Sequence, residues 1–456
     1  MVEHIKSIIL FLLVAFSLLL TFALWTYQPE FQDLDTQKFV DETKLEGQEK
    51  LIEEVVYPNK IIFHDYQEHK MFREKVNEND LYNEILSWEF SSIRTPANLN
   101  TIRRHLEWSE PLGWTNNKSY QSIEIQYPVG VPFELVNQMF SVNKNDVNWS
   151  GEFNKLYLNM KSNDQEIQFV FASDSHQKIL TGEIESSKAF QRLENEFNSS
   201  NTMVNLQEYR LNNDHTVYLP EEKLSLRSYA VTTEPLSEQP MINVLFKSPS
   251  SVRRVATNNS DSYWTDGSRR LVTQPVFDND EVMSFVNSLY KDGPLMNKED
   301  MIQKSIEFTN DHTGWTDDFR LDNLNEFGLL NYRMYYNGYP IYDTSQQFEQ
   351  LLQMEQKWIN NHLYSLKRPL FKINNNIGID RRDLASGENV YQLIQTINEQ
   401  LSYIIQDVRI GYKLNARNDG SIVVLELDPE WHVKFGEDIW RPLSSFNDVL
   451  TNQGVE

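Results

Sequence analysis

Residues Ser7 to Trp25 read SIILFLLVAFSLLLTFALW, a run of 19 residues without a charged side chain near the start of a polar, acidic chain. A helix rises about 1.5 Å per residue, so this run covers roughly 28 Å, close to the hydrocarbon core of about 30 Å in a membrane. It therefore predicts a transmembrane helix, which we place at residues 7–27. The location of the rest of the chain follows from this segment.

The charges beside the apolar run predict its orientation. Before it, the possible cations are the α-amino group, His4 and Lys6, whereas the acidic Glu30 and Asp33 follow it. Basic residues favour the cytoplasmic side of a membrane. We therefore expect a single-pass protein of the cell membrane, with residues 1–6 in the cytoplasm and the bulk of the chain extracytoplasmic.

A cleaved secretory signal is the alternative interpretation of the same run. The run is longer than the 7 to 15 residues of a usual signal core, and the bulky segment Trp25–Pro29 follows where processing requires small residues. Thr21-Phe22-Ala23 makes only a poor cleavage site. We favour an uncleaved anchor, and the absence of cysteine excludes lipid attachment at a processed N-terminal cysteine.

The composition indicates a globular protein with a sizeable core. Charged residues make up 24%, hydrophobic residues 40% and aromatic residues 12% of the 456 residues, which excludes a disordered tail. Lys and Arg number 42 against 66 Asp and Glu, a formal net charge of −24 that disfavours binding of nucleic acid or of an anionic lipid surface. Without cysteine, disulfides and thiolate metal sites are excluded.

Composition shifts divide the rest of the chain into a stalk and three parts. Gln28–Glu54 carries nine acidic and three basic residues, and like charges extend such a spacer, so we assign residues 28–58 to an acidic stalk. Alternating runs mixed with helical stretches follow, and they predict an α+β fold of antiparallel sheets and packed helices. We expect an N-terminal domain at 59–200, a central domain at 201–310 and a C-terminal domain at 311–456.

The C-terminal part carries the clearest local signals. Asn337-Gly338 lies between two aromatic runs and predicts a type I′ hairpin, because both residue types tolerate positive φ. A second hairpin is expected around Asn418-Asp419-Gly420. Between the hairpins, apolar residues recur at helical spacing. They are Val390, Leu393, Ile394, Ile397, Leu401 and Ile404. A helix packed on an antiparallel sheet satisfies this order. In the central part, Val252–Ala256 and Ser268–Gln274 are expected to pair in a similar hairpin through a turn at Tyr263–Gly267.

Several segments resemble the YycH family of membrane-anchored regulators in low-GC Gram-positive bacteria. They are Val2–Trp25, Val252-Arg253-Arg254, Tyr263–Arg270, Asn325–Gly328 and Asn337–Pro340. The resemblance covers nearly the whole chain, and it implies one membrane helix, a three-domain extracytoplasmic part, and central and C-terminal domains similar in plan to YycI. It also implies a partnership with a YycI-like membrane protein and with the sensor histidine kinase YycG, also called WalK, of an essential two-component system. The family has no catalytic signature.

Enzyme templates fail on the residues themselves. Ser141–Lys144 and Ser288–Lys291 spell Ser-x-x-Lys, but the companion Lys-Thr-Gly is missing, and no nucleophile elbow, P-loop or Gly-x-Gly-x-x-Gly occurs. His64, Glu68 and His69 lack the spacing that places two imidazoles on one helix face, so we expect surface histidines and no metal. We expect no catalytic residues and no cofactor. The alternative is a tethered enzyme acting on the cell wall or a wall-binding module.

Two groups of residues are candidates for partner binding. The membrane face consists of Leu10, Val14, Ser17, Thr21 and Leu24. Its two hydroxyl residues stand four positions apart and would let another helix approach closely. The alternative is that both hydroxyls bond to their own helix and the stripe faces lipid.

The second group is extracytoplasmic. It consists of Arg253, Arg254, Arg269, Arg270, Tyr335 and Tyr339. The arginines would attract an acidic partner or a wall polymer, unless nearby Asp or Glu already pair with them. Tyrosines suit interfaces, but alternation along a strand also sends some of them inward. We expect core positions for Tyr332 and Tyr336, with Tyr335 on the opposite face.

Overall fold

The computed structural model divides the chain into two units, Met1–Thr43 and Lys44–Glu456. The described residues are Leu13, Ser17, 43–95, 121–143, 149–161, 165–173, 178–199, 201–212, 215–256, 262–277, 280–290, 293–325, 327–343, 349–401, 404–418, 423–436 and 439–446. Leu13 and Ser17 are helical. The rest of the predicted membrane face lies outside the described residues, namely Leu10, Val14, Thr21 and Leu24. Within the described part of the chain, no helix is long and apolar enough to cross a membrane.

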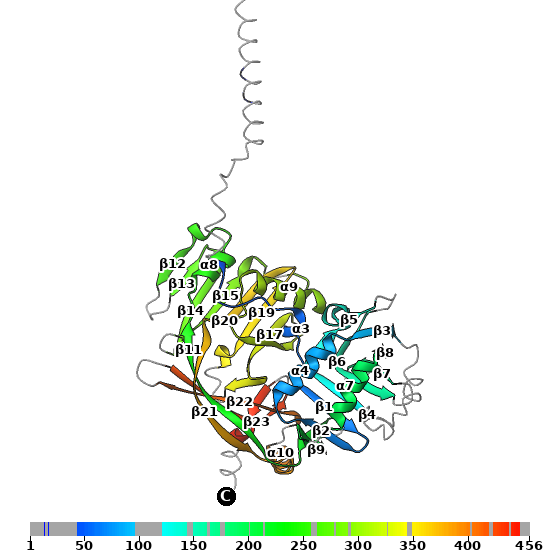
Figure 1. The fold of residues 1–456 in the computed structure, drawn as a ribbon. Helices are drawn as coiled ribbons and strands as arrows, with labels where there is room; N and C mark the ends of the chain where they lie inside the picture. Colours follow the sequence, from blue (N-terminus) through cyan, green and yellow to red (C-terminus); the bar gives the residue numbers. More distant parts are fainter. Residues whose placement is uncertain are drawn as a thin grey trace, which may run out of the picture. The chain divides into compact units, whose positions relative to one another are not determined.

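The first sheet of the unit Lys44–Glu456 has ten described strands in the order β10-β9-β2-β1-β4-β6-β7-β8-β3-β5 (Figure 1). The strands are β1 (Lys60–Asp65), β2 (Glu68–Phe72), β3 (Glu89–Arg94), β4 (Gln121–Pro132), β5 (Ser141–Val142), β6 (Glu152–Lys161), β7 (Glu166–Ala172), β8 (Ile179–Ile184), β9 (Met203–Arg210) and β10 (Thr216–Pro220). Pairing is antiparallel except between β3 and β5. The accompanying helices are α3 (Ile52–Val55), α4 (Lys75–Leu86), η2 (Phe133–Leu135), α6 (Val136–Met139) and α7 (Ser187–Phe197).

Helices α4 and α7 lie over the first sheet because each has an apolar face (Figure 1). On α4, Leu81, Tyr82 and Ile85 are fully buried, and on α7 Phe190 and Leu193 enter the same core. These residues recur at the spacing of one helix face. The two helices therefore close one side of the sheet.

The second sheet contains fourteen described strands. They are β11 (Leu224–Pro235), β12 (Arg253–Ala256), β13 (Ser262–Thr265), β14 (Arg269–Phe277), β15 (Asp280–Asn287), β16 (Asp318–Leu324), β17 (Leu329–Tyr336), β18 (Tyr339–Asp343), β19 (Gln353–Ile359), β20 (His362–Pro369), β21 (Phe371–Leu384), β22 (Ile405–Asn418), β23 (Val423–Phe435) and β24 (Ile439–Pro442). The helices are α8 (Gln239–Leu245), η3 (Pro249–Ser251), η4 (Ser288–Tyr290), α9 (Lys298–Asp311), η5 (Glu349–Leu351), α10 (Gly387–Leu401) and η6 (Leu443–Phe446). Strand β18 joins the two halves of this sheet, since it pairs antiparallel with β17 and parallel with β22.

The hairpins and the helix predicted for the C-terminal part are confirmed, but Ile404 was wrongly assigned to the apolar helix face, because it lies beyond the end of α10 at Leu401 and is 67% exposed. Asn337 and Gly338 have φ angles of 45° and 81°, and they connect β17 to β18 as the type I′ turn requires. Helix α10 buries Val390, Ile394 and Ile397 in a core shared with β9, β10, β22 and β23. Strands β22 and β23 pair antiparallel over their length. The predicted α+β class is likewise confirmed by this mixture of sheets and packed helices.

The hairpin expected in the central part has a different form. Strand β12 pairs with β13, and β13 pairs with β14, so Tyr263 and Trp264 form a middle strand of a three-stranded meander and are not part of a turn. The turn follows at Asp266, whose carboxylate accepts backbone hydrogen bonds from Ser268 and Arg269 at 2.9 and 2.8 Å. The prediction placed the turn too early because the aromatic residues suit a strand.

Residues 44–58 form part of the globular unit, so the predicted stalk is wrong for this segment. Leu45 and Val55 are buried, and the backbone of Leu45 donates a hydrogen bond of 2.8 Å to the His312 carbonyl. The Lys50 ammonium lies 3.0 Å from the Asp318 carboxylate. Acidic composition suggested an extended spacer, but the few apolar side chains between the charges have a core to enter.

Strand pairing connects the predicted central domain with the predicted C-terminal domain. Strand β15, in the predicted central domain, pairs with β20 of the predicted C-terminal domain, and β11 pairs with both β21 and β23. The two predicted parts therefore share one continuous sheet. The first sheet ends at Pro220, about twenty residues beyond the expected boundary at 200, and the three-domain division stays a prediction.

Candidate functional site

A cavity of about 470 Å³ lies between the two sheets and is lined mainly by polar side chains. The first sheet contributes residues of β4, β6 and β10, including Gln126 and Lys155. The second sheet contributes residues of β16, β17, β19 and β22 to β24, including Arg333 and Arg409. Pockets of 300 to 1,000 Å³ are typical of small-molecule sites. This cavity, at the meeting of both sheets, is the candidate functional site.

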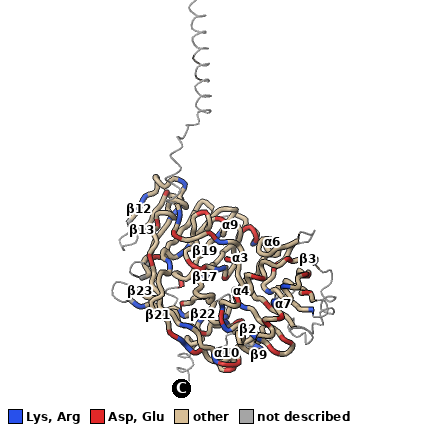
Figure 2. Tube along the Cα trace, viewed as in Figure 1, with Lys and Arg blue, Asp and Glu red and all other residues tan. Residues whose placement is uncertain are grey.

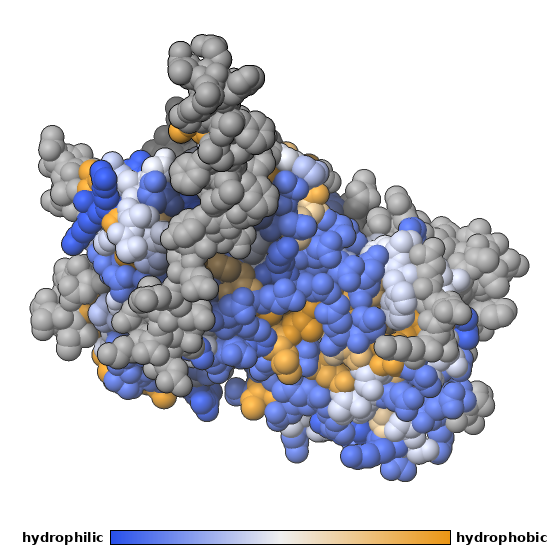
Figure 3. Space-filling model, turned by 90° about the horizontal axis from the view of Figure 1, so that it is seen from above, coloured by the Kyte–Doolittle hydropathy of each residue, from blue (hydrophilic) through white to orange (hydrophobic). Residues whose placement is uncertain are grey.

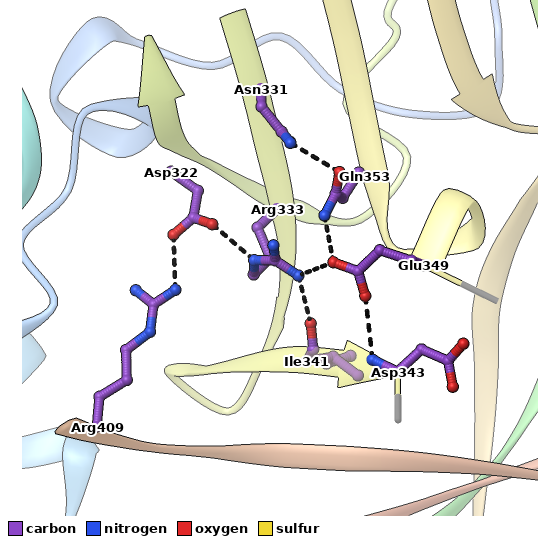
Figure 4. Close-up of polar contacts among 8 residues, drawn as sticks. All are labelled: Asp322, Asn331, Arg333, Ile341, Asp343, Glu349, Gln353 and Arg409. Atoms are coloured by element: carbon purple, nitrogen blue, oxygen red, sulfur yellow. Dashed lines mark hydrogen bonds and ion pairs between the residues drawn. The ribbon is translucent and has the colours of Figure 1, made fainter. Parts of the chain in front are cut away.

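The centre of the site is a buried carboxylate held between two guanidinium groups (Figure 4). Asp322 accepts a hydrogen bond of 2.7 Å from Arg333 Nε and another of 3.0 Å from Arg409. All three side chains are at most 6% exposed. Asp322 occupies a register shift between β16 and β17, where Leu321 and Asn323 have cross-strand partners and Asp322 has none. A bulge of this kind redirects a side chain, and here it places the carboxylate between β17 and β22.

Arg333 extends this arrangement to three further segments (Figure 4). Its second nitrogen donates to Glu349 at 2.8 Å and to the Ile341 carbonyl at 3.1 Å. Glu349 in turn accepts from the backbone N–H of Asp343 at 3.1 Å and from the Gln353 amide. Buried ions require such compensation by opposite charges and hydrogen bonds. The network therefore ties β16, β17, β18, β19 and β22 together behind the cavity.

Aromatic rings complete the packing around the two arginines. The Tyr342 ring lies 4.3 Å from the Arg333 guanidinium and 5.0 Å from that of Arg409, while Trp440 lies 3.8 Å from Arg409 on another side. Desolvated cation–π contacts of this kind contribute about 2 kcal/mol. His432 packs 4.3 Å from Tyr342, and burial lowers the pKa of His432 to about 3. Its imidazole is therefore neutral at physiological pH.

The charge state of the central carboxylate follows from its neighbours. Burial by itself would raise the pKa of Asp322, but the guanidinium groups of Arg409 and Arg333 lower it to about 2. Burial opposes the charged form of Arg333 as well, yet the carboxylates of Glu349 and Asp322 raise its pKa. Asp322 and Arg333 are thus both ionised at neutral pH. Ion pairs hold the network together, and the cavity opens beside it.

A second buried polar cluster lies on the first sheet, where surface histidines were expected. His64 and His69 face each other across the β1–β2 hairpin with their Nδ1 atoms 2.8 Å apart, and His64 Nε2 lies 3.2 Å from Glu124. The prediction is wrong because the segment forms a hairpin, which turns both side chains to one buried face. Burial, with His64 as a neighbour, lowers the pKa of His69 to about 4. Glu124 also pairs with Lys155 of the cavity wall at 3.4 Å.

The Glu68 side chain lies apart from the buried pair of histidines. Glu68 is on the exposed side of the hairpin and pairs with Lys70 at 2.8 Å. Over the described ranges, no cluster of three or more His, Cys, Asp or Glu residues has an arrangement that could hold a metal ion. Lys144 and Lys291 of the two Ser-x-x-Lys motifs lie outside the described residues.

The predicted arginine group is partly brought together. Arg253 and Arg270 flank Thr265 on neighbouring strands, and both are exposed. Arg254 is also exposed and lies 5.1 Å from the Trp264 ring. Basic residues gather around β12 and β13 in Figure 2. A role of this patch in partner binding stays a prediction.

Arg269 differs from the other three arginines. It is buried and pairs with Asp266 at 3.1 Å. The Asp266 carboxylate lies in the turn just before Arg269. Pairing with a nearby acidic residue, the alternative to partner binding, therefore holds for this arginine. Arg269 is therefore not part of the exposed basic surface.

The predicted tyrosines are largely interior. Tyr332 is fully buried, as expected for a core position, and its hydroxyl group forms a hydrogen bond of 2.6 Å with the Ser305 hydroxyl. Tyr335 is also buried, and its ring lies 4.8 Å from the Arg320 guanidinium, so it is not available at the surface. Tyr339 is half-buried and packs near Tyr412. The described surface seen from above is predominantly hydrophilic, with apolar residues in separate patches (Figure 3).

The residues of the cavity were not anticipated from the sequence. Asp322 and Arg409 stand 87 positions apart and belong to no motif. Their contact depends on β18, which pairs with both β17 and β22. A single charged residue inside an otherwise uncharged strand, such as Arg333 in LLNYRMYY, is a local signal for a buried ion pair.

Comparison with known proteins gives a consistent result over the whole chain. The models for the N-terminal and C-terminal domains of YycH protein match residues 3–202 and 214–447. The two-component system WalR/WalK regulatory protein YycH of Bacillus subtilis strain 168 is 24% identical over 465 residues, which covers 99% of this chain and 98% of that protein. The crystal structure of YycH from Bacillus subtilis has a TM-score of 0.70 at 18% identity, covers 88% of this chain and 99% of that one, and shows the same fold.

Proposed function

The chain belongs to the YycH family, and we propose that it is a membrane-anchored regulator that changes the output of a WalK-type sensor histidine kinase controlling cell-wall metabolism. The observation that carries this proposal is the full-length similarity to a WalR/WalK regulatory protein. Family membership identifies the chain as a regulatory protein of a two-component system and not as an enzyme. The finer points, namely the membrane anchor, its orientation and the partners, are our inference.

We propose that the contacts with partners are made in two places. In the membrane, Ser17 and Thr21 would allow a helix of the kinase or of a YycI-like protein to approach closely. Outside the membrane, the exposed Arg253, Arg254 and Arg270 would face an acidic surface. The two contacts would act together because they belong to one chain.

Regulation requires that a contact be tighter in one conformation of the kinase than in the other. A difference of about 1 to 3 kcal/mol between the two states biases them roughly 5- to 150-fold. Packing of one extra helix against the kinase helices supplies an interaction of this size if its fit differs between signalling states. The sign of regulation depends on which state is bound more tightly.

Co-purification of the full-length chain with the membrane kinase tests the helix contact. The variant Ser17→Leu with Thr21→Leu should reduce capture several-fold, since two bulky side chains replace the small ones at the contact. A matched control, Ala15→Leu with Ala23→Leu, changes small residues on the opposite helix face and should leave capture unchanged. Equal capture by both variants would remove this face from the proposal.

A second experiment separates the anchor from the outer part of the chain. Residues 1–28 are exchanged for an unrelated membrane helix, and kinase-dependent transcription is measured. Altered transcription with normal protein levels supports regulation through the helix. Unchanged transcription would assign regulation to the extracytoplasmic contacts, for which the Arg253, Arg254 and Arg270 variants to Gln are the next measurement. Hydrolysis of cell wall by the purified chain would contradict a purely regulatory role.

A further inference from the structure

We propose that the cavity between the two sheets is a binding site for a short peptide with free termini, a ligand that carries a carboxylate, an ammonium group and amide groups. The cavity volume of about 470 Å³ falls in the range of small-molecule sites. This inference rests on the cavity alone and does not depend on contacts with a kinase. The lining identifies the chemical class of the ligand through its hydrogen-bonding atoms, its charges and its aromatic rings.

Three residues that line the cavity carry buried side-chain atoms for which no hydrogen-bond partner is found among the described residues. Arg409 Nε is buried and finds no acceptor among the described residues, although the other end of this guanidinium binds Asp322. Asn331 Oδ1 and Asn59 Oδ1 are buried acceptors without a donor in the same part of the chain. Buried polar atoms are normally paired, and an unpaired one costs about 1 to 3 kcal/mol. A ligand with both donors and acceptors, as every peptide unit has, would satisfy them.

Charges of both signs line the cavity beyond the Asp322 network. Lys434 lies between Asp407 and Trp440 in the register of β22, β23 and β24, so a basic and an acidic residue are neighbours on adjacent strands. Arg441 from β24 and Asp343 from β18 also line the cavity. A ligand with one charge would meet repulsion from half of these groups. A zwitterion can place its carboxylate near the basic side chains and its ammonium near the acidic ones.

Two other ligand classes fit this lining less well. Saccharides commonly stack on an open aromatic face, but the Arg409 guanidinium covers Trp440 at 3.8 Å, and the buried Tyr127 ring packs against Phe153 at 5.3 Å. A multivalent anion such as phosphate would meet the carboxylates of Asp322 and Glu349, which already neutralise the arginines. The peptide is the class that uses both signs of charge.

The experiment measures retention of small molecules by the full-length chain in detergent, using native mass spectrometry followed by calorimetry. The probes are a random tripeptide library with free termini, the same library acetylated and amidated at its ends, chitotriose, and inorganic phosphate. The variants are Lys434→Gln and Arg409→Gln, with Arg417→Gln as the matched control. Arg417 lies on the same strand as Arg409, but it is exposed and pairs with Glu426 outside the cavity.

Wild-type protein should retain tripeptides with free termini and bind the blocked library at least tenfold more weakly. Lys434→Gln and Arg409→Gln should each weaken binding at least tenfold, while Arg417→Gln should bind as wild type does. If Arg409→Gln fails to fold, the binding measured for Lys434→Gln decides the test. The proposal is overturned by a lack of tripeptide retention, by equal retention of the blocked library, by retention of chitotriose or phosphate in its place, or by unchanged binding in the variants. No kinase is present, so a negative result leaves the proposed regulatory role untouched.

Discussion

Replacing Asp322 by Asn should lower the free energy of unfolding by about 3 to 5 kcal/mol, the usual cost of breaking a buried ion pair. The substitution keeps the shape of the side chain but removes the negative charge between Arg333 and Arg409. Arg333 retains Glu349 as a partner at 2.8 Å. Arg409 has no second ion pair among the described residues, so most of the cost arises from its buried, uncompensated charge.

Urea unfolding of the full-length chain in detergent, followed by tryptophan fluorescence, measures this loss. Glu426→Gln is the matched control, because Glu426 pairs with Arg417 at 3.5 Å on exposed parts of β22 and β23 and should cost less than about 1 kcal/mol. In a thermal melt, an unfolding entropy of about 2.1 cal/mol/K per residue over roughly 400 residues converts 3 to 5 kcal/mol into a decrease in melting temperature of about 4 to 6 °C.

The pH dependence provides an independent check of the same reasoning. Because the pKa of Asp322 is lowered to about 2 from its ordinary 3.8, its contribution to stability is complete above about pH 4 and is lost as the pH falls toward 2. The stability difference between wild type and Asp322→Asn should therefore shrink over this interval. A loss no larger than that of Glu426→Gln, or a difference that stays constant down to pH 2, would refute the central role of Asp322.

Three further substitutions test other parts of the fold. Gly338→Val should destabilise the chain by at least about 1 to 2 kcal/mol in a thermal melt, because φ is 81° and the new Cβ would lie 3.0 Å from Lys75 Cβ. Gly338→Asn should cost less. Equal melting temperatures of the two variants would contradict this account. Ile394→Ala should cost about 2 to 5 kcal/mol in urea unfolding, because Ile394 is fully buried on α10, and a loss below 1 kcal/mol would show that the helix is not part of the core. Burial, with the Arg368 charge nearby, lowers the pKa of His312 to about 3. This histidine therefore takes up a proton on unfolding below pH 6.5. The free energy of unfolding consequently falls by up to about 1.4 kcal/mol per pH unit toward pH 3. His312→Gln should flatten that dependence, and an unchanged slope would argue against a neutral buried His312.

Local chemistry was predictable where neighbouring residues decide the conformation. Gly338 tolerates positive φ because it has no Cβ, and Asn337 tolerates it because its short polar side chain can bond locally, so the turn forms where they stand. The apolar spacing of α10 likewise predicts which face is buried, and Val390 and Ile394 lie on it. The stalk was predicted less well, since Leu45 enters a core built from residues near His312, far along the chain.

The amino-acid sequence by itself determined the α+β class, the two C-terminal hairpins, the amphipathic helix and membership in the YycH family. Only the tertiary structure decided that Asp322 meets Arg333 and Arg409, that His64 and His69 face inward, and that a polar cavity separates the two sheets. The physical reason is that turns and helix faces depend on adjacent residues. The burial of a charge depends on which distant strands pair, and here that choice rests on β18 between β17 and β22.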